Sequence, residues 1–154
     1  MRNLMILCLA LISFAACKKE VNWTAVDRDK IEQYLTDKNL DAQAHSSGLY
    51  YILRQPEGTG SHPKLYDNVT VKYKGYLLDG TIFDQTSADR PIFKTDLIPG
   101  GLIDGWLIAI PLLKEGGKGT FLIPSGLAYG SRSPSPLIPP NTVLLFDIEL
   151  LSIN

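Results

Sequence analysis

Apolar and polar side chains alternate most clearly in the stretch NVTVKYKGYLL, residues 68–78. Val69, Val71 and Tyr73 fall on one side of an extended chain, while threonine and lysine side chains fall on the other. The dipeptide Asp79-Gly80 follows, and it is typical of a tight turn between antiparallel strands. The pattern therefore predicts a hairpin that returns through TIFDQT, residues 81–86.

Three further segments have the composition of strands. GLYYILRQ (48–55) is rich in aromatic and branched residues, and KGTFLIP (118–124) is another short apolar run. In the C-terminal TVLLFDIELLSIN (142–154), Asp147 and Glu149 mark the face in contact with solvent, because successive side chains of a strand point to opposite faces. The buried face then carries Leu144, Phe146, Ile148 and Leu150.

One helical pattern lies between these strands and is suited to covering their apolar face. It is LIDGWLIAIPLL (102–113), with Gly100 and Gly101 before it and KEGG after it. A sheet of several antiparallel strands wrapped around one helix gives an α+β fold. Gly105 lies inside the pattern, where glycine costs up to about 1 kcal/mol relative to alanine. We therefore expect something to approach the backbone closely beside Trp106, which is either a functional side chain or a large core residue.

A second helix is predicted near the N-terminus. Thr24, with Asp27 three residues later, is typical of a helix N-terminus, and we expect the helix to run to about Leu40. Its apolar positions form one narrow stripe, made of Ile31, Tyr34 and Leu35. Either this stripe packs on the domain, or residues 24–40 form a homodimer with a second copy of the chain.

The first 17 residues have the pattern of an export signal. Arg2 precedes an apolar run over residues 4–14, which is shorter than the roughly 20 residues that a membrane-spanning helix needs. The sequence FAAC resembles the lipobox of bacterial lipoproteins, although leucine is commoner at its first position. The resemblance implies that cleavage exposes Cys17 for lipidation and that the exported chain is anchored to a membrane. Lys18 favours the outer membrane or periplasmic face; the alternative is a soluble secreted chain cut at the same place.

Composition excludes several other functions. The chain of 154 residues is long enough for one domain and a short extension, and its net charge of -1 gives nucleic acid nothing to bind. The cysteines are Cys8, inside the apolar run, and Cys17, so the mature chain forms no disulfide. The two histidines, His45 and His62, lie in polar, turn-rich segments away from any nucleophile. We therefore expect no metal site, no cofactor and no ionised nucleophile.

Four motifs resemble those of FKBP-type peptidyl-prolyl isomerases, in the family's order and at its separations. They are VKYKGYLLDGTIFDQT (71–86), GGLIDGW (100–106), LAYG (127–130) and LIPPNTVLLFDIELL (137–151). The resemblance implies a curved antiparallel half-barrel around one short helix, preceded by an N-terminal helical extension. The chain then divides into a lipoprotein signal peptide (1–16), a lipid-anchored tether with its helix (17–47) and an isomerase domain (48–154).

The resemblance also implies an aromatic cup as the active site. Its catalytic residues would be Tyr73, Phe83, Asp84, Phe93, Trp106, Tyr129 and Phe146, and its substrate-binding residues Leu102, Ile103 and Ile138. Trp106 would form the floor, and the Ile103 N–H and the Tyr129 hydroxyl would donate hydrogen bonds to substrate carbonyls. Asp84 would add polarity at the edge, with Arg90 as its candidate partner one position later than in many relatives.

The function implied is rotation about X-Pro bonds in exported polypeptides, by twisting the amide without covalent chemistry. Macrolide immunosuppressant-type compounds would be further ligands. The sequence departs from the family in the loop SRSPSP (131–136), where Pro134 replaces a frequent histidine. This loop keeps open an alternative: a lipid-anchored binding module or holdase chaperone with weak or no isomerase turnover.

Overall fold

The structure is a computed structural model, and it describes residues 20–154. The expected signal peptide and Cys17 lie outside these residues. Within the described part of the chain, no helix is both long and apolar enough to cross a bilayer.

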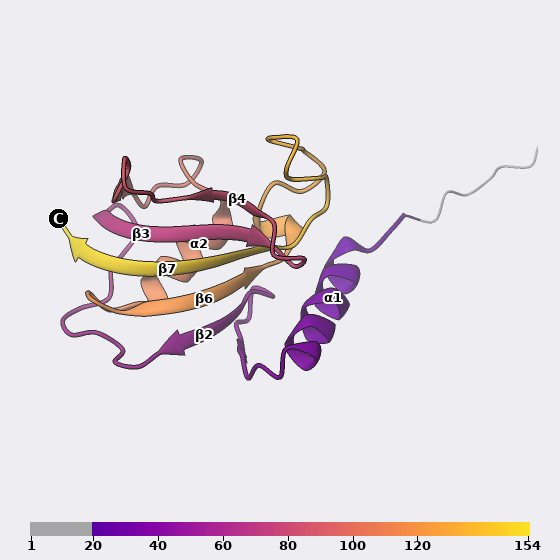
Figure 1. The fold of residues 1–154 in the computed structure, drawn as a ribbon, viewed down its shortest axis with the longest axis horizontal. Coiled ribbons are helices and arrows are strands. Elements are labelled where there is room, and N and C mark those ends of the chain that lie inside the picture. Colours follow the sequence, from indigo (N-terminus) through magenta and orange to yellow (C-terminus); the bar gives the residue numbers. More distant parts are fainter. Residues whose placement is uncertain (1–19) are drawn as a thin grey trace, which may run out of the picture.

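An antiparallel sheet of seven strands forms the body of the molecule (Figure 1). The strands are β1 (Gln43–Ala44), β2 (Tyr50–Arg54), β3 (Asn68–Leu77), β4 (Ile82–Gln85), β5 (Phe93–Asp96), β6 (Lys118–Ile123) and β7 (Leu144–Ile153). Their order is β1-β2-β6-β7-β3-β4, and β5 pairs with β3 beside β4. The predicted hairpin is confirmed as β3 and β4, and Gly80 in its turn has a φ of 91°, which favours glycine.

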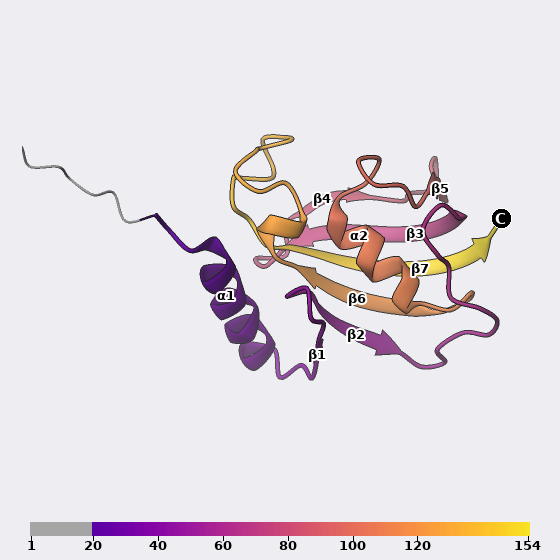
Figure 2. The ribbon, with the colours of Figure 1, turned by 180° about the vertical axis from the view of Figure 1, so that it is seen from behind.

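The helix that lies on the concave face is α2 (Asp104–Ala109), and a 3₁₀ turn, η1 (Ile110–Leu112), continues it. Figure 2 shows α2 in front of the curved sheet. The predicted helix over 102–113 is therefore wrong at both ends. Pro111 explains the C-terminal end, since proline has no N–H to donate to an α-helical hydrogen bond.

The main core lies between α2 and the concave face. Phe121, Ile123, Leu144, Ile148 and Leu150 reach it from β6 and β7 and are at most 1% exposed. The predicted buried face of β7 is thus confirmed.

The outer face of the sheet is also buried at one end, which alternation along β7 did not predict. Leu145 points to that face and is 0% exposed, because α1 (Trp23–Asp37) packs over it. Figures 1 and 2 show α1 at the end of the sheet. The buried members of this second core are Ile31, Leu35, Leu122, Val143 and Leu145. Of the two predictions for the apolar stripe of α1, packing on the domain is the one observed.

The bounds of α1 differ from those predicted. The N-cap is Asn22, whose side chain accepts a hydrogen bond from the Ala25 N–H at 3.2 Å, and the helix ends at Asp37 instead of about Leu40. Asp27 does not cap the helix. It is 1% exposed and bonds to Ser125, 98 residues along the chain.

Candidate active site

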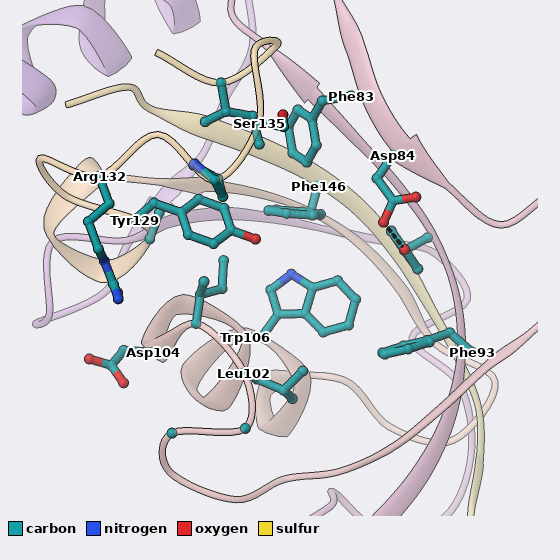
Figure 3. Close-up of a pocket in the computed structure, with 17 residues that line it drawn as sticks. Phe83, Asp84, Phe93, Leu102, Asp104, Trp106, Tyr129, Arg132, Ser135 and Phe146 are labelled. Atoms are coloured by element: carbon teal, nitrogen blue, oxygen red, sulfur yellow. Dashed lines mark hydrogen bonds between the residues drawn. The ribbon is translucent and has the colours of Figure 1, made fainter. Parts of the chain in front are cut away.

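A cavity of about 660 Å³ opens between the concave face, α2 and the loops that follow it (Figure 3). The ten residues that the sequence assigned to the cup all line this cavity: Tyr73, Phe83, Asp84, Phe93, Leu102, Ile103, Trp106, Tyr129, Ile138 and Phe146. They come from four strands, one helix and two loops. Their catalytic and binding roles remain predictions.

Trp106 lies at the base of the cavity because α2 packs tightly on the sheet. A Cβ atom on Gly105 would lie 2.4 Å from Cγ2 of Ile123, so only glycine allows the helix to approach β6 this closely. The close approach expected beside Trp106 is therefore that of the Ile123 side chain. The indole is 5% exposed, and its Nε1 has no hydrogen-bond partner within residues 20–154.

Three aromatic rings surround the indole in nearly perpendicular, T-shaped contacts. The ring centroids of Tyr73, Phe146 and Phe93 lie 5.1, 5.3 and 6.0 Å from that of Trp106, at interplanar angles of 79°, 86° and 80°. Such edge-to-face contacts are favourable beyond the area they bury. They fix the indole in one orientation at the bottom of an apolar cup.

Phe83 extends this aromatic wall because the neighbouring strand carries a glycine. A Cβ atom on Gly75 would lie 2.6 Å from the Phe83 ring and 2.8 Å from that of Phe146. Glycine on β3 thus makes room for the two rings, which meet edge to face at 5.5 Å.

Asp84 forms the polar edge of the cup. Its Oδ2 accepts a hydrogen bond from the Tyr73 hydroxyl, and its Oδ1 lies 2.5 Å from Nη2 of Arg90. The same guanidinium nitrogen donates to the carbonyl of Gln85 at 2.7 Å. The prediction that Arg90 partners Asp84 is confirmed, and both oxygens of the carboxylate have fixed partners.

These contacts set the protonation states at the edge. Partial burial by itself would raise the pKa of Asp84, but hydrogen bonds from Tyr73 and Arg90 and the guanidinium charge outweigh it and leave that pKa below its usual value. Burial, followed by the hydrogen bond to Asp84, raises the pKa of Tyr73 to about 12. At neutral pH the edge therefore holds a charged carboxylate and a neutral phenol.

Two donors face the cup without a partner among residues 20–154. The Tyr129 hydroxyl points toward the centre of the cavity in Figure 3 and makes no hydrogen bond there. Burial and the charge of Asp84 raise its pKa, so it stays protonated. Ile103 is the N-cap of α2, and its N–H makes none of the hydrogen bonds of the loops and caps.

The structure adds residues that sequence reasoning missed. Those that also line the cavity are Gly100, Gly101, Asp104, Ala128, Arg132, Pro134 and Ser135. Arg132, Pro134 and Ser135 belong to the loop 131–136, which was singled out only for departing from the family. Asp104 lies inside GGLIDGW, but nothing in that motif separates a residue at the rim from one in the core.

The cavity contains no strong nucleophile among the residues described, since neither a cysteine nor a histidine lines it. His45 bonds with Ser47 at 2.9 Å, and His62 lies 3.0 Å from the carbonyl of Pro111, both away from the cup. What the arrangement offers is a dry aromatic floor, two free donors and one fixed carboxylate.

Residues 59–151 match the family model of FKBP-type peptidyl-prolyl cis-trans isomerases. The chain is 43% identical over 130 residues to the probable isomerase FkpA of Neisseria meningitidis, with 83% of this chain and 47% of that relative covered. It is also 43% identical over 108 residues to FK506-binding protein 1 of Kluyveromyces lactis, which covers 70% of this chain and 95% of the relative. The chain thus spans about half the length of the FkpA relatives that it matches.

Solved structures agree with this match. The crystal structure of FkpA from Escherichia coli superposes with a TM-score of 0.72 at 36% identity, covering 85% of this chain and 61% of that one. A peptidyl-prolyl cis-trans isomerase from Pseudomonas syringae gives 0.70 at 30% identity, covering 88% and 98%. In sequence and in fold, this chain belongs to the family of FKBP-type peptidyl-prolyl cis-trans isomerases.

Proposed function

We propose that this chain catalyses cis-trans isomerisation of X-Pro bonds in polypeptides. The observation that carries the proposal is the indole of Trp106, held by three T-shaped aromatic contacts at the bottom of a cup that contains no cysteine or histidine among its described residues. A flat apolar floor of this size suits a proline ring. The family membership and the names of the relatives favour the isomerase over the binding module or holdase chaperone.

The chemistry needs no nucleophile, because no bond breaks. An X-Pro bond isomerises slowly, in tens to hundreds of seconds at about 25 °C, since twisting the amide loses its resonance. A cup that fits the twisted amide better than the planar one lowers the barrier by differential binding. A thousandfold acceleration requires only about 4 kcal/mol of such preference.

The cup supplies this preference through its apolar walls and its free donors. A planar amide has a large dipole that water solvates well, and the aromatic walls exclude water. We assign the floor to Trp106, and we assign the hydrogen bonds to the substrate carbonyls to the Ile103 N–H and the Tyr129 hydroxyl. Because Tyr73 and Arg90 fix Asp84, its carboxylate gives the edge a constant negative charge beside the twisting carbonyl.

Exchange NMR on a panel of X-Pro tetrapeptides tests the activity directly, with the full chain purified in detergent. We expect acceleration that a macrolide ligand of FKBP proteins abolishes. Tyr129→Phe, which removes one hydroxyl from the cup, should reduce kcat/KM about tenfold, the value of one hydrogen bond. Tyr66→Phe is the matched control because Tyr66 is 73% exposed and outside the cavity.

The same experiment separates the two functions. Macrolide and peptide binding without acceleration would reject the isomerase and support a binding module, in which the altered loop 131–136 grips apolar segments. If the chain shows no binding and no acceleration, both the isomerase and the binding module are rejected.

We further propose that the chain is exported and anchored by lipid on Cys17, and that its clients are exported polypeptides. The support is the apolar run and the FAAC sequence at the N-terminus. The same proposal includes the division of the chain into a signal peptide (1–16), a lipid-anchored tether with its helix (17–47) and an isomerase domain (48–154). Mass spectrometry of the membrane-extracted chain should find an acylated Cys17, and Cys17→Ser should release the chain from membranes. An unmodified Cys17 in a soluble chain would contradict the anchor.

A homodimer through residues 24–40 would need a surface of α1 other than the apolar stripe. Ile31 and Leu35 are 0% and 9% exposed because they pack on the sheet of the same chain. Sedimentation of the full chain at several concentrations tests it, and a monomer throughout would reject the dimer.

A further inference from the structure

Asp27 is a buried carboxylate that the proposed mechanism does not use. It lies on α1, is 1% exposed and is far from the cup in sequence. Its Oδ2 accepts two hydrogen bonds from Ser125, one from the N–H at 2.8 Å and one from the hydroxyl at 2.5 Å. Its Oδ1 is buried without a partner in the described part of the chain.

A carboxylate is an unfavourable group to bury at this position. Burying a polar atom without a partner costs about 1–3 kcal/mol, and an apolar side chain of similar size would avoid that cost. What the carboxylate supplies and an apolar side chain cannot is a pair of directed, charge-assisted bonds to one residue. Asp27 therefore serves to hold Ser125 in place through these two hydrogen bonds.

Ser125 begins the turn that carries Tyr129. It is the first residue of η2 (Ser125–Leu127), and its carbonyl accepts hydrogen bonds from the N–H groups of Ala128 at 3.0 Å and Gly130 at 2.8 Å. These two residues flank Tyr129. Gly130 in turn accepts from the N–H of Asn141 at 2.7 Å, which closes the loop over the cavity.

A continuous set of hydrogen bonds thus runs from α1 to the wall of the cup. Asp27 holds the N–H and hydroxyl of Ser125, and the carbonyl of Ser125 holds both neighbours of Tyr129. Figure 2 shows α1 beside the short orange turn that contains η2. Ile31 and Leu35, by contrast, fix α1 to the outer face of the sheet and belong to a core that includes no residue of the cavity.

We propose that Asp27 is a positioning residue of the active site, through which the N-terminal helix fixes the Tyr129 wall. The helix is therefore part of the catalytic unit as well as a link to the N-terminus. The proposal rests on the proposed isomerase function, in which the Tyr129 hydroxyl binds a substrate carbonyl.

Three variants of the full chain test this role by exchange NMR kinetics. Asp27→Ala removes both bonds to Ser125 and should lower kcat/KM about tenfold, the equivalent of one such hydrogen bond, mainly by raising KM. Asp27→Asn keeps an acceptor oxygen for both donors of Ser125 and should restore most of the loss. Leu35→Ala, about two turns along α1, should destabilise the helix packing and leave KM unchanged at a temperature where all variants are folded.

A second readout keeps the proposal testable if the chain proves not to be an isomerase. The amide resonances of Ala128, Tyr129, Gly130 and Asn141 should shift in Asp27→Ala and stay in place in Leu35→Ala. Equal KM values in the two alanine variants, or unshifted amides in Asp27→Ala, would overturn the positioning role. If the unaltered chain shows no isomerisation but the amides shift in Asp27→Ala, only the proposed function is rejected.

Discussion

Gly105 is a residue of α2 with no room for a side chain. A Cβ atom there would lie 2.4 Å from Cγ2 and 2.8 Å from Cδ1 of Ile123. Overpacking of a core costs typically 1–3 kcal/mol, and the better helix propensity of alanine offsets up to about 1 kcal/mol of that. We expect Gly105→Ala to lower the free energy of unfolding by about 1–2 kcal/mol in urea denaturation.

Two controls isolate this clash. At Gly126 a Cβ atom would meet nothing within 4 Å, so Gly126→Ala should leave the free energy of unfolding nearly unchanged. In an Ile123→Ala background, Gly105→Ala should cost much less, because the clashing atoms are gone. Full additivity of the two substitutions would show that the contact with Ile123 is not the reason for glycine.

Tyr73 joins the aromatic floor to the polar edge, and its titration should be visible in the stability of the fold. Its pKa is about 12 in the folded chain against 10.0 for an unperturbed tyrosine. The folded state therefore holds this proton more tightly than the unfolded state, so the contribution is complete below pH 10 and is lost as the pH rises through 12. Urea midpoints measured up to pH 12 should fall less steeply in Tyr73→Phe than in the unaltered chain.

The difference between the two curves is informative because other tyrosines also titrate in this range. Tyr66→Phe removes an exposed phenol and should keep the slope of the unaltered chain. Parallel curves for Tyr73→Phe and the unaltered chain would mean that burial and the hydrogen bond to Asp84 do not raise the pKa of Tyr73 in solution.

At the scale of elements, alternation and turn residues predicted the strands well and the helices less well. The hairpin of β3 and β4 follows from Val69, Val71 and Asp79-Gly80, whose local chemistry decides the structure. The buried state of Leu145 does not follow, because it depends on α1, which is distant in sequence. The helix N-terminus pattern of Thr24 and Asp27 does not predict the buried role of Asp27 for the same reason: its partner, Ser125, is 98 residues away.

The loop 131–136 shows the same limit at the rim of the cup. The Ser133 hydroxyl lies 2.9 Å from the carbonyl of Ser135 and 2.8 Å from that of Ile138, so it braces the loop across the cavity mouth. No motif carries this information. We expect Ser133→Ala to weaken macrolide binding by about 2–10-fold, the range of one neutral hydrogen bond, with little change in stability.

Ser131→Ala is the matched control for this loop, since Ser131 is exposed and its side chain makes no hydrogen bond within residues 20–154. Calorimetric titration of both variants measures the effect. Unchanged affinity in Ser133→Ala would mean that the loop keeps its shape without the brace, through its backbone hydrogen bonds.

At the scale of the molecule, the sequence motifs identified the members of the cup but not how the chain brings them together. Tyr73, Trp106 and Phe146 meet at the floor although 73 residues separate the first and last of them. Family order gave their identity, while spacing alone left Trp106 as either a functional side chain or a large core residue. The rim residues Asp104 and Arg132 were not predicted, because their place depends on how the start of α2 and the loop 131–136 lie relative to each other.

The sheet separates two cores of unequal size. The concave core joins α2 to β3, β6 and β7, with partly buried side chains added from β2, β4 and β5. The outer core consists of Ile31, Leu35, Leu122, Val143 and Leu145 with a few partly buried neighbours. A helix held by a small core of this kind is expected to open locally at a lower free energy than the central strands. A substitution in the outer core should therefore lower the opening free energy of α1 without lowering that of the central strands.

Ile31→Ala tests this separation. Ile31 is 0% exposed on α1, so truncation should cost the outer core about 2–4 kcal/mol. In native-state hydrogen exchange at low urea, the amides of α1 should then exchange much faster, while those of β3 and β7 keep their protection. Val21→Ala, at a residue 55% exposed, is the control that should change neither. Equal loss of protection in α1 and in the central strands would instead mean that helix and sheet unfold as one cooperative unit, in which case the Asp27–Ser125 contact joins the outer helix to the whole domain.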